Sequence, residues 1–234
     1  MSDFNDVADN YNDIVNEALM EEQRALFHGS DHEYFNQYKM FYLKPLFFDS
    51  SNVKKEIKIL DYGCGVGILS SMLGRTIPAA VIHGFDISEK SIADVPKAMK
   101  ESTRFRFTNN LSELDNDYGF SILSTVLHHV PLVGRSEVLS NIYQRLKVGG
   151  KIIIIEHNMK NPLTRQTVKA CSFDDDAIMM NVPEVKKLLL DAGYKNIQSR
   201  YIVFFPKMLS GFRFIDRCLT WCPIGAQFLV WGEK

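Results

Sequence analysis

Five short runs of β-branched or aromatic residues alternate with helical patterns in the middle of this 234-residue chain. Turn residues bound each run, which is typical of buried strands. Parallel strands need crossover connections, and helices between successive strands supply them with a right-handed winding. We therefore expect an α/β fold with a doubly wound, mostly parallel sheet. The predicted strands are residues 56–62, 80–86, 104–108, 119–126 and 149–157, and the helical patterns between them are 67–76, 88–101 and 134–147.

Two segments lie outside this alternating unit. Residues 1–50 carry widely spaced aromatic side chains and are predicted to form an N-terminal helical lid, so that residues 51–234 form one globular domain. After the fifth strand, a polar connection leads to a helix near residues 184–194. Two late strands, 196–206 and 225–233, are expected to close the sheet as an antiparallel edge pair.

Composition excludes several classes of function. The formal net charge of -1 argues against nucleic-acid binding, because affinity for a phosphate backbone needs a surplus of Lys and Arg. The acidic amino terminus is unlike a signal peptide, and no apolar run reaches roughly 18 residues, so we expect a cytoplasmic protein. Cys218 and Cys222 lie four residues apart without a second pair or a histidine partner. We therefore predict free thiols and no metal site.

The segment ILDYGCGVGILS, residues 59–70, joins the first strand to a helix through Gly63, Gly65 and Gly67. Glycines there let a ligand approach the backbone amides without interference from a Cβ atom. Asp61 in front of them would repel a pyrophosphate but attract the ammonium and sulfonium groups of S-adenosylmethionine. The glycine spacing also differs from the dinucleotide fingerprint, G-x-G-x-x-G. These features favour S-adenosylmethionine, and a plain tight turn is the alternative.

Asp86 provides an independent indication, because it ends the second strand roughly 20 residues beyond the glycines, where a carboxylate can accept hydrogen bonds from both ribose hydroxyls. The alternative role for Asp86 is to cap the following helix, a role for which Ser88 competes.

Four segments together resemble the successive motifs of class I S-adenosylmethionine-dependent methyltransferases. They are LDYGCGVG, FDIS, FSILSTVLHHV and LKVGGKIIIIEHN, within about residues 55–158. The resemblance implies a Rossmann-like, seven-stranded sheet with an antiparallel last strand. The tail EHNMKNPLTRQTVKACSFDDDA is similar to a bacterial branch associated with surface-glycan or lipid-linked sugar pathways, although Met159 and Ser172 replace prolines that are usual in that branch.

The resemblance also implies roles for individual residues. The glycine loop would take the methionine moiety, Asp86 the ribose, and Ile87 one face of the adenine. Asn109 or Asn110 would accept a hydrogen bond from the adenine amino group. The cofactor-binding candidates are Tyr11, Asp61, Gly63, Cys64, Gly65, Gly67, Asp86, Ile87, Asn109, Asn110 and Ser124.

Methyl transfer is an in-line displacement in which the protein holds the nucleophile and the methyl carbon close, aligned and dry. An oxygen nucleophile also needs a base. His129 is expected to be a buried histidine at a helix start, satisfied by the backbone. His128, after the fourth strand, and His157, at the end of the fifth, are the catalytic candidates, and a hydrogen-bonded core histidine is the alternative for each.

We predict a methyltransferase that acts on a small-molecule or lipid-linked glycan acceptor at oxygen. The alternatives are N-methylation and a regulatory protein that binds S-adenosylmethionine without turnover; the oligomeric state stays open. Residues 207–221 form an amphipathic stretch with basic Arg213 and Arg217. We expect its apolar stripe to pack on the last strands, and the alternative is contact with a membrane surface. The stripe is Leu209, Phe212, Ile215, Leu219 and Cys222.

Overall fold

A computed structural model of the chain describes residues 31–48, 57–171, 174 and 176–234. The chain divides into two compact units, Met1–Asp115 and Asn116–Lys234, and each is described by itself. Tyr11 and most of the predicted lid lie outside the described residues, as does the predicted domain boundary at residue 50. These predictions therefore stay predictions.

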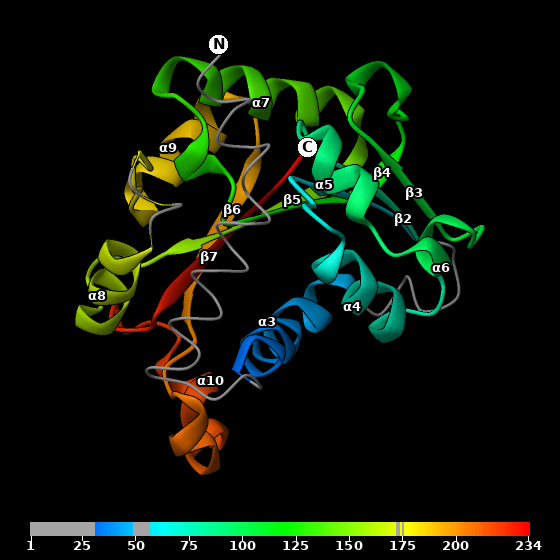
Figure 1. The fold of residues 1–234 in the computed structure, drawn as a ribbon. Helices are drawn as coiled ribbons and strands as arrows, with labels where there is room; N and C mark the ends of the chain where they lie inside the picture. Colours follow the sequence, from blue (N-terminus) through cyan, green and yellow to red (C-terminus); the bar gives the residue numbers. More distant parts are fainter. Residues whose placement is uncertain (1–30, 49–56, 172–173, 175) are drawn as a thin grey trace. The chain divides into compact units, whose positions relative to one another are not determined.

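The first unit, drawn from blue to green in Figure 1, contains three parallel strands in the order β3-β2-β1. Helix α4 packs against β2, and α3 packs against α4. Its elements are α3 (Asp31–Phe47), β1 (Ile57–Tyr62), α4 (Ile68–Thr76), β2 (Ala80–Phe85), α5 (Glu89–Asp94), α6 (Lys97–Lys100), β3 (Phe105–Thr108) and the 3₁₀ helix η1 (Leu111–Glu113).

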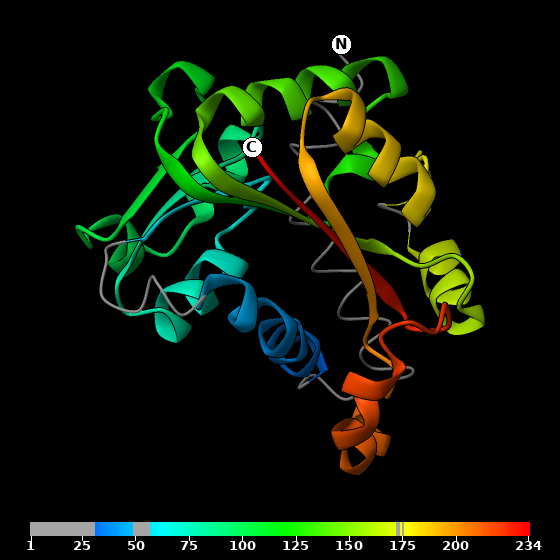
Figure 2. The same cartoon turned by 180° about the vertical axis from the view of Figure 1, so that it is seen from behind.

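The second unit contains four strands in the order β4-β5-β7-β6. Strands β4 and β5 are parallel, and β7 is antiparallel to both β5 and β6, between which it lies (Figures 1 and 2). Its elements are β4 (Tyr118–Ser124), η2 (Leu127–His129), α7 (Leu132–Arg145), β5 (Leu146–His157), α8 (Pro162–Ala170), α9 (Val182–Asp191), β6 (Lys195–Ile202), η4 (Lys207–Ile215), α10 (Asp216–Leu219) and β7 (Gln227–Glu233).

The described residues thus contain the seven strands of a Rossmann-like α/β fold, mostly parallel with an antiparallel last strand, and the predicted fold class is confirmed. Strand β5 shows why the sequence predicts this so well. Four consecutive isoleucines, residues 152–155, are fully buried, and successive side chains of a strand point to opposite faces. Both faces of β5 are therefore covered, as expected for a strand inside a doubly wound sheet.

One predicted helix was wrong in detail, and one helix was not predicted. Residues 88–101 form two short helices, because Pro96 cannot supply the backbone N–H that would continue α5. The connection after β5 contains α8, which has Pro162 in its first turn and Asn161 as its N-cap. The Asn161 side chain accepts a hydrogen bond from the Thr164 amide at 3.1 Å, the usual way in which a polar segment starts a helix.

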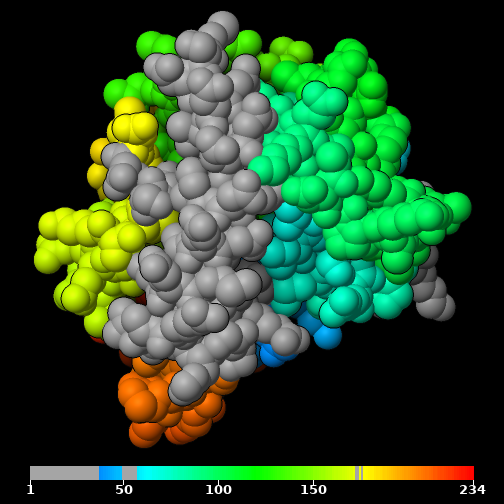
Figure 3. All heavy atoms as spheres, in the orientation of Figure 1, coloured from blue at the N-terminus to red at the C-terminus, as the bar shows by residue number. Residues whose placement is uncertain are grey.

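The amphipathic stretch after β6 also differs from the prediction. It forms the 3₁₀ helix η4, with non-helical dihedral angles at Leu209, followed by the short α10. Leu209 and Phe212 are 41% and 50% exposed, so the expectation that the whole stripe packs on the last strands was wrong. In Figure 3 this segment, in orange, is exposed at the surface. Among the described residues, no helix has the length and apolar character needed to cross a membrane.

Candidate functional site

The glycine loop between β1 and α4 depends on backbone conformations that only glycine adopts readily. Gly63, Gly65 and Gly67 have φ angles of 78°, 53° and 84°, in the left-handed region. Gly67 is also the N-cap of α4, which sets the point where the chain turns from loop to helix. The three alternate glycines are therefore required by the shape of the loop.

The backbone amides of this loop donate hydrogen bonds to other groups of the protein. Gly63 and Cys64 donate to the Phe85 carbonyl at 2.7 and 3.0 Å, which ties the loop to the end of β2. Gly65 donates to Asp86 Oδ2 at 2.8 Å, and Gly67 donates to the Cys64 carbonyl at 2.9 Å. The expectation that a ligand would approach the backbone amides of this loop was therefore wrong for these four N–H groups, because each already donates a hydrogen bond within the protein. A phosphate-binding loop keeps such donors for the anion, so this arrangement argues further against a dinucleotide.

Gly84 is a residue of this region that sequence reasoning missed. It lies in β2 opposite Asp61 of β1. A Cβ atom on Gly84 would lie 2.4 Å from the Phe107 ring and 2.8 Å from Cys64 Sγ. Only glycine therefore lets the loop approach β2 this closely, and the sequence signal for it was a glycine inside a strand.

Asp61 is a buried carboxylate, 1% exposed. Its Oδ2 accepts a hydrogen bond from Ser70 Oγ at 2.6 Å. Burial raises the pKa of Asp61 to about 6; nearby Asp86 adds to this shift, while Ser70 and Lys39 oppose it. A cation that arrives beside this carboxylate would stabilise its charged form, so Asp61 is suited to a positively charged ligand.

Asp86 follows β2 and is half-buried. Its Oδ1 accepts from the Ser88 amide at 2.9 Å, and its Oδ2 accepts from Gly65. The cap of α5 is Ser88, whose hydroxyl accepts from the Ser91 amide at 3.1 Å. The helix-cap alternative for Asp86 is thus excluded, and each of its oxygens keeps a lone pair for a further donor.

The remaining candidates of the first unit fall into two groups. Ile87 is 55% exposed beside Asp86, and Asn109 is exposed just after β3, so both side chains are accessible. Asn110 caps η1, accepting from the Ser112 amide at 3.0 Å, which makes Asn109 the better acceptor for an adenine amino group. Cys64 is buried, and burial raises the pKa of its thiol, so it is a neutral packing residue.

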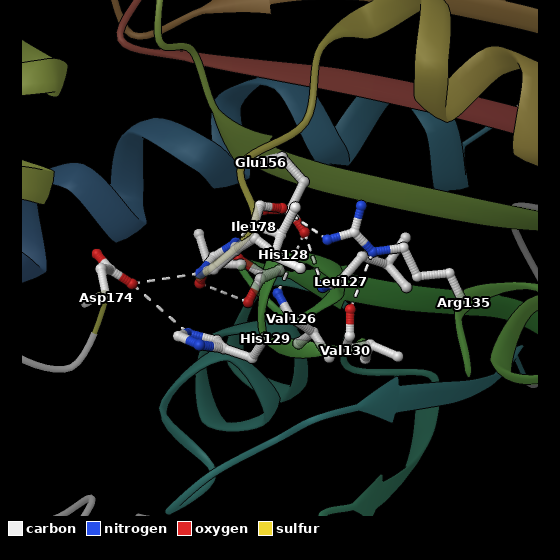
Figure 4. A network of polar contacts seen from close by, with 11 residues as sticks. Val126, Leu127, His128, His129, Val130, Arg135, Glu156, Asp174 and Ile178 are labelled. Atoms are coloured by element: carbon white, nitrogen blue, oxygen red, sulfur yellow. Dashed lines mark hydrogen bonds and ion pairs between the residues drawn. The ribbon is translucent and has the colours of Figure 1, made fainter. Parts of the chain in front are cut away.

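A histidine–carboxylate cluster lies in the second unit, where η2 follows β4 (Figure 4). Glu156 of β5 is 1% exposed, and its Oε1 accepts from the amides of Val126 and Leu127 at 3.3 and 2.8 Å. Its Oε2 bonds to His128 Nδ1. Glu156 therefore fixes both the backbone of η2 and the ring of His128.

His128 is 2% exposed, and its Nε2 lies 3.4 Å from Asp174 Oδ1. Burial alone would lower the pKa of His128, but Glu156 and Asp174 outweigh it and raise the pKa to about 9. A protonated imidazole has no lone pair to accept a proton. Without another ligand on its ring, His128 is therefore a poor catalytic base, and the structure argues against that candidate role.

His129 and His157 lie beside this pair. His129 Nε2 is 3.6 Å from Asp174 Oδ1, so its ring faces a carboxylate, which the sequence-based expectation of a backbone-satisfied histidine did not include. Burial, together with the neighbouring charge of His128, lowers the pKa of His129 to about 4. The His157 ring centroid is 5.5 Å from that of His128, and His157 is half-buried at the end of β5. Ser124, which ends β4, is also half-buried.

Arg135 of α7 holds together two backbone segments that carry residues of this cluster. Its side chain is buried and donates to the carbonyls of Val130 and Ile178 at 3.0 and 2.6 Å. The Ile178 amide in turn donates to the His128 carbonyl at 2.9 Å. Arg135 therefore fastens the segment that follows Asp174 to η2 (Figure 4).

Comparisons with known proteins agree with the fold. The family model of a methyltransferase domain matches residues 31–199. No curated protein sequence matches this chain. Among solved structures, a SAM-dependent methyltransferase from Archaeoglobus fulgidus has a TM-score of 0.64 at 18% identity, and the match covers 92% of this chain and 98% of that one.

Two further structures are similar over a part of their length. Phosphoethanolamine N-methyltransferase 2 of Haemonchus contortus, solved with S-adenosyl-L-methionine, has a TM-score of 0.59 at 14% identity and matches 84% of this chain. The CMeT domain of the citrinin polyketide synthase has a TM-score of 0.60 at 15% identity and matches 85% of this chain. This chain spans about half the length of each, 52% in both cases.

These findings confirm the predicted enzyme class and agree with the predicted cofactor, S-adenosylmethionine. The bacterial branch suggested by the tail stays a prediction. Because the family model matches more than half of the chain, and the strands are those of a Rossmann-like sheet, this chain belongs to the methyltransferase domain family and has the fold of the S-adenosylmethionine-dependent methyltransferases.

Proposed function

We propose that this chain transfers the methyl group of S-adenosylmethionine to an oxygen of a small-molecule or lipid-linked glycan acceptor. The main support for the proposal is that two carboxylates flank the glycine loop. Asp61 is buried in front of it, and Asp86 follows the next strand. The amides of the loop donate hydrogen bonds within the protein. Two carboxylates near a loop of this kind suit a cofactor with an ammonium, a sulfonium and a ribose.

Each part of the cofactor has a candidate partner in the first unit. The carboxylate of Asp61 would attract the positive charges of the methionine moiety, and Asp86 would accept from the ribose hydroxyls. The exposed side chain of Ile87 would cover the adenine, and Asn109 would accept from its amino group. Bound S-adenosylmethionine supplies an electrophilic methyl group, and these residues bind and orient it.

A hydroxyl acceptor needs a group that takes its proton. Because His128 is held between two carboxylates, we take His157 as the stronger of the two candidates; it is half-buried at the end of β5, and its ring centroid lies 5.5 Å from that of His128. N-methylation is the second candidate function, since one of the similar structures is a phosphoethanolamine N-methyltransferase.

The exposed segment after β6 supports an acceptor at a membrane surface, and we include weak peripheral membrane contact in the proposal. Met208, Phe214 and Trp221 are 90%, 79% and 76% exposed. Large apolar side chains beside basic residues are the usual composition of a segment that rests on an anionic bilayer. The basic residues of this segment are Lys207, Arg213 and Arg217.

Calorimetry with the cofactor tests the proposed function. Asp86→Ala removes two acceptors for charged hydrogen bonds, so binding of S-adenosylmethionine should weaken by about tenfold or more. The matched control is Glu101→Ala, because Glu101 is an exposed carboxylate of the same unit whose side chain is 65% exposed. Unchanged affinity in a folded Asp86→Ala protein, or tighter binding of NAD than of S-adenosylmethionine by the natural protein, would contradict the assignment.

A further inference from the structure

We propose that His128, His129 and Asp174 bind one divalent transition-metal ion. Each side chain offers one ligand atom, and the three atoms lie within 4.8 Å of one another. All three residues belong to the second unit, so the cluster is internal to one compact part of the chain. The dashed contacts from Asp174 to both rings are drawn in Figure 4.

The two separations from the Asp174 carboxylate match the spacing between ligands of one metal ion. Asp174 Oδ1 is 3.4 Å from His128 Nε2 and 3.6 Å from His129 Nε2. Hydrogen bonds between nitrogen and oxygen usually span about 2.7–3.2 Å. Metal–ligand bonds of about 2.0–2.2 Å in a tetrahedral arrangement place neighbouring ligand atoms about 3.3–3.6 Å apart. Both distances from Asp174 Oδ1 fall at the second spacing.

The surroundings of His128 also resemble those of a metal ligand. Its Nδ1 bonds to Glu156, a buried carboxylate that is itself held by the amides of Val126 and Leu127. A histidine ligand commonly donates its other ring N–H to a carboxylate, which fixes the tautomer and the ring orientation. With Nδ1–H directed at Glu156, a metal ion would displace the proton of Nε2, whose lone pair then faces the side where Asp174 and His129 lie.

The set of donor atoms indicates which ions would bind. Two imidazole nitrogens and one carboxylate oxygen suit Zn²⁺ or Fe²⁺, whereas Mg²⁺ and Ca²⁺ prefer oxygen ligands throughout. Three protein ligands leave at least one coordination position open, and a water molecule or an oxygen of a small ligand would occupy it. This site differs from the cysteine pair that the sequence analysis considered and excluded.

Zinc binding by the full-length chain tests the proposal. After treatment with a chelator and dialysis, we expect calorimetry to show one saturable equivalent of Zn²⁺. His129→Gln and Asp174→Asn should each weaken binding by at least about tenfold, because each removes a ligand. The control is the triple variant Cys171→Ser/Cys218→Ser/Cys222→Ser, because these three residues carry the cysteine thiols of the same unit. It should bind Zn²⁺ as the natural protein does.

Cobalt substitution gives a second measurement that needs no variant. Co²⁺ bound to nitrogen and oxygen ligands should show visible d–d absorption without a thiolate-to-cobalt charge-transfer band. The proposal is overturned if Zn²⁺ does not bind saturably, if the thiolate band appears and the cysteine variant abolishes binding, or if folded His129→Gln protein binds Zn²⁺ unchanged. If Zn²⁺ does not bind saturably, the three residues form only a network of ion pairs.

Discussion

Replacing Asp61 with Asn should make the protein more stable and should weaken its binding of S-adenosylmethionine. Asp61 is 1% exposed, and its carboxylate receives a hydrogen bond from Ser70. Asn keeps an oxygen that can accept this hydrogen bond, but it carries no charge to bury. The variant therefore shows separately how much the buried charge lowers the stability of the protein and how much it contributes to ligand affinity.

The pKa of Asp61 sets the magnitude. Burial raises it from 3.8 to about 6, a difference of roughly two units, which corresponds to about 3 kcal/mol. Because the folded-state pKa is raised, the stability contributed by protonated Asp61 is fully present below about pH 4 and is lost as the pH rises to about 6. The gain in the free energy of unfolding for Asp61→Asn should thus grow from near zero at pH 4 to about 3 kcal/mol at pH 7.

Urea denaturation of both proteins at several pH values between 4 and 7 measures this gain. Calorimetry with S-adenosylmethionine measures the loss of affinity, which we expect to be about tenfold. Glu101→Gln is the control, because an exposed carboxylate should change neither quantity. A gain that does not depend on pH, or a less stable variant, would refute the reasoning about the buried charge. A more stable variant with unchanged affinity would remove Asp61 from the cofactor site.

Two further predictions concern the reaction and its location. His157→Ala should lower turnover with the true acceptor by about 10² to 10⁴ while the affinity for S-adenosylmethionine stays the same. Near-normal turnover in both this variant and His128→Ala would mean that neither histidine is the base. In flotation with anionic liposomes, the chain should rise with the lipid at low salt, and Arg213→Gln/Arg217→Gln should reduce this more than Arg165→Gln/Lys169→Gln on α8. If the protein stays at the bottom of the gradient at low salt, the membrane contact is refuted and the acceptor is a soluble molecule.

The sequence was informative where neighbouring residues carry the signal. The four buried isoleucines of β5 and the three glycines after β1 are local patterns, and each constrains the backbone within a few residues. The general rules of strand connection then predict a doubly wound, mostly parallel sheet. This is why the fold class and the place of the glycine loop could be predicted, whereas the break of the helix at Pro96 was missed because the apolar pattern continues across it.

The tertiary structure decided what the polar side chains contact. Glu156 and Asp174 were not predicted as site residues, because an acid after a buried strand and an acid in a polar segment carry no local mark of a histidine partner. Asp174 lies 45 residues after His129 in the chain, and only the path of the second unit brings their side chains to 3.6 Å. The same holds for the loop amides: the sequence placed the glycines, but the contact with the end of β2 determined that their N–H groups bond to the protein itself. Hydrogen bonds and charges depend on distances between residues far apart in the sequence, and these distances exist only in the folded chain.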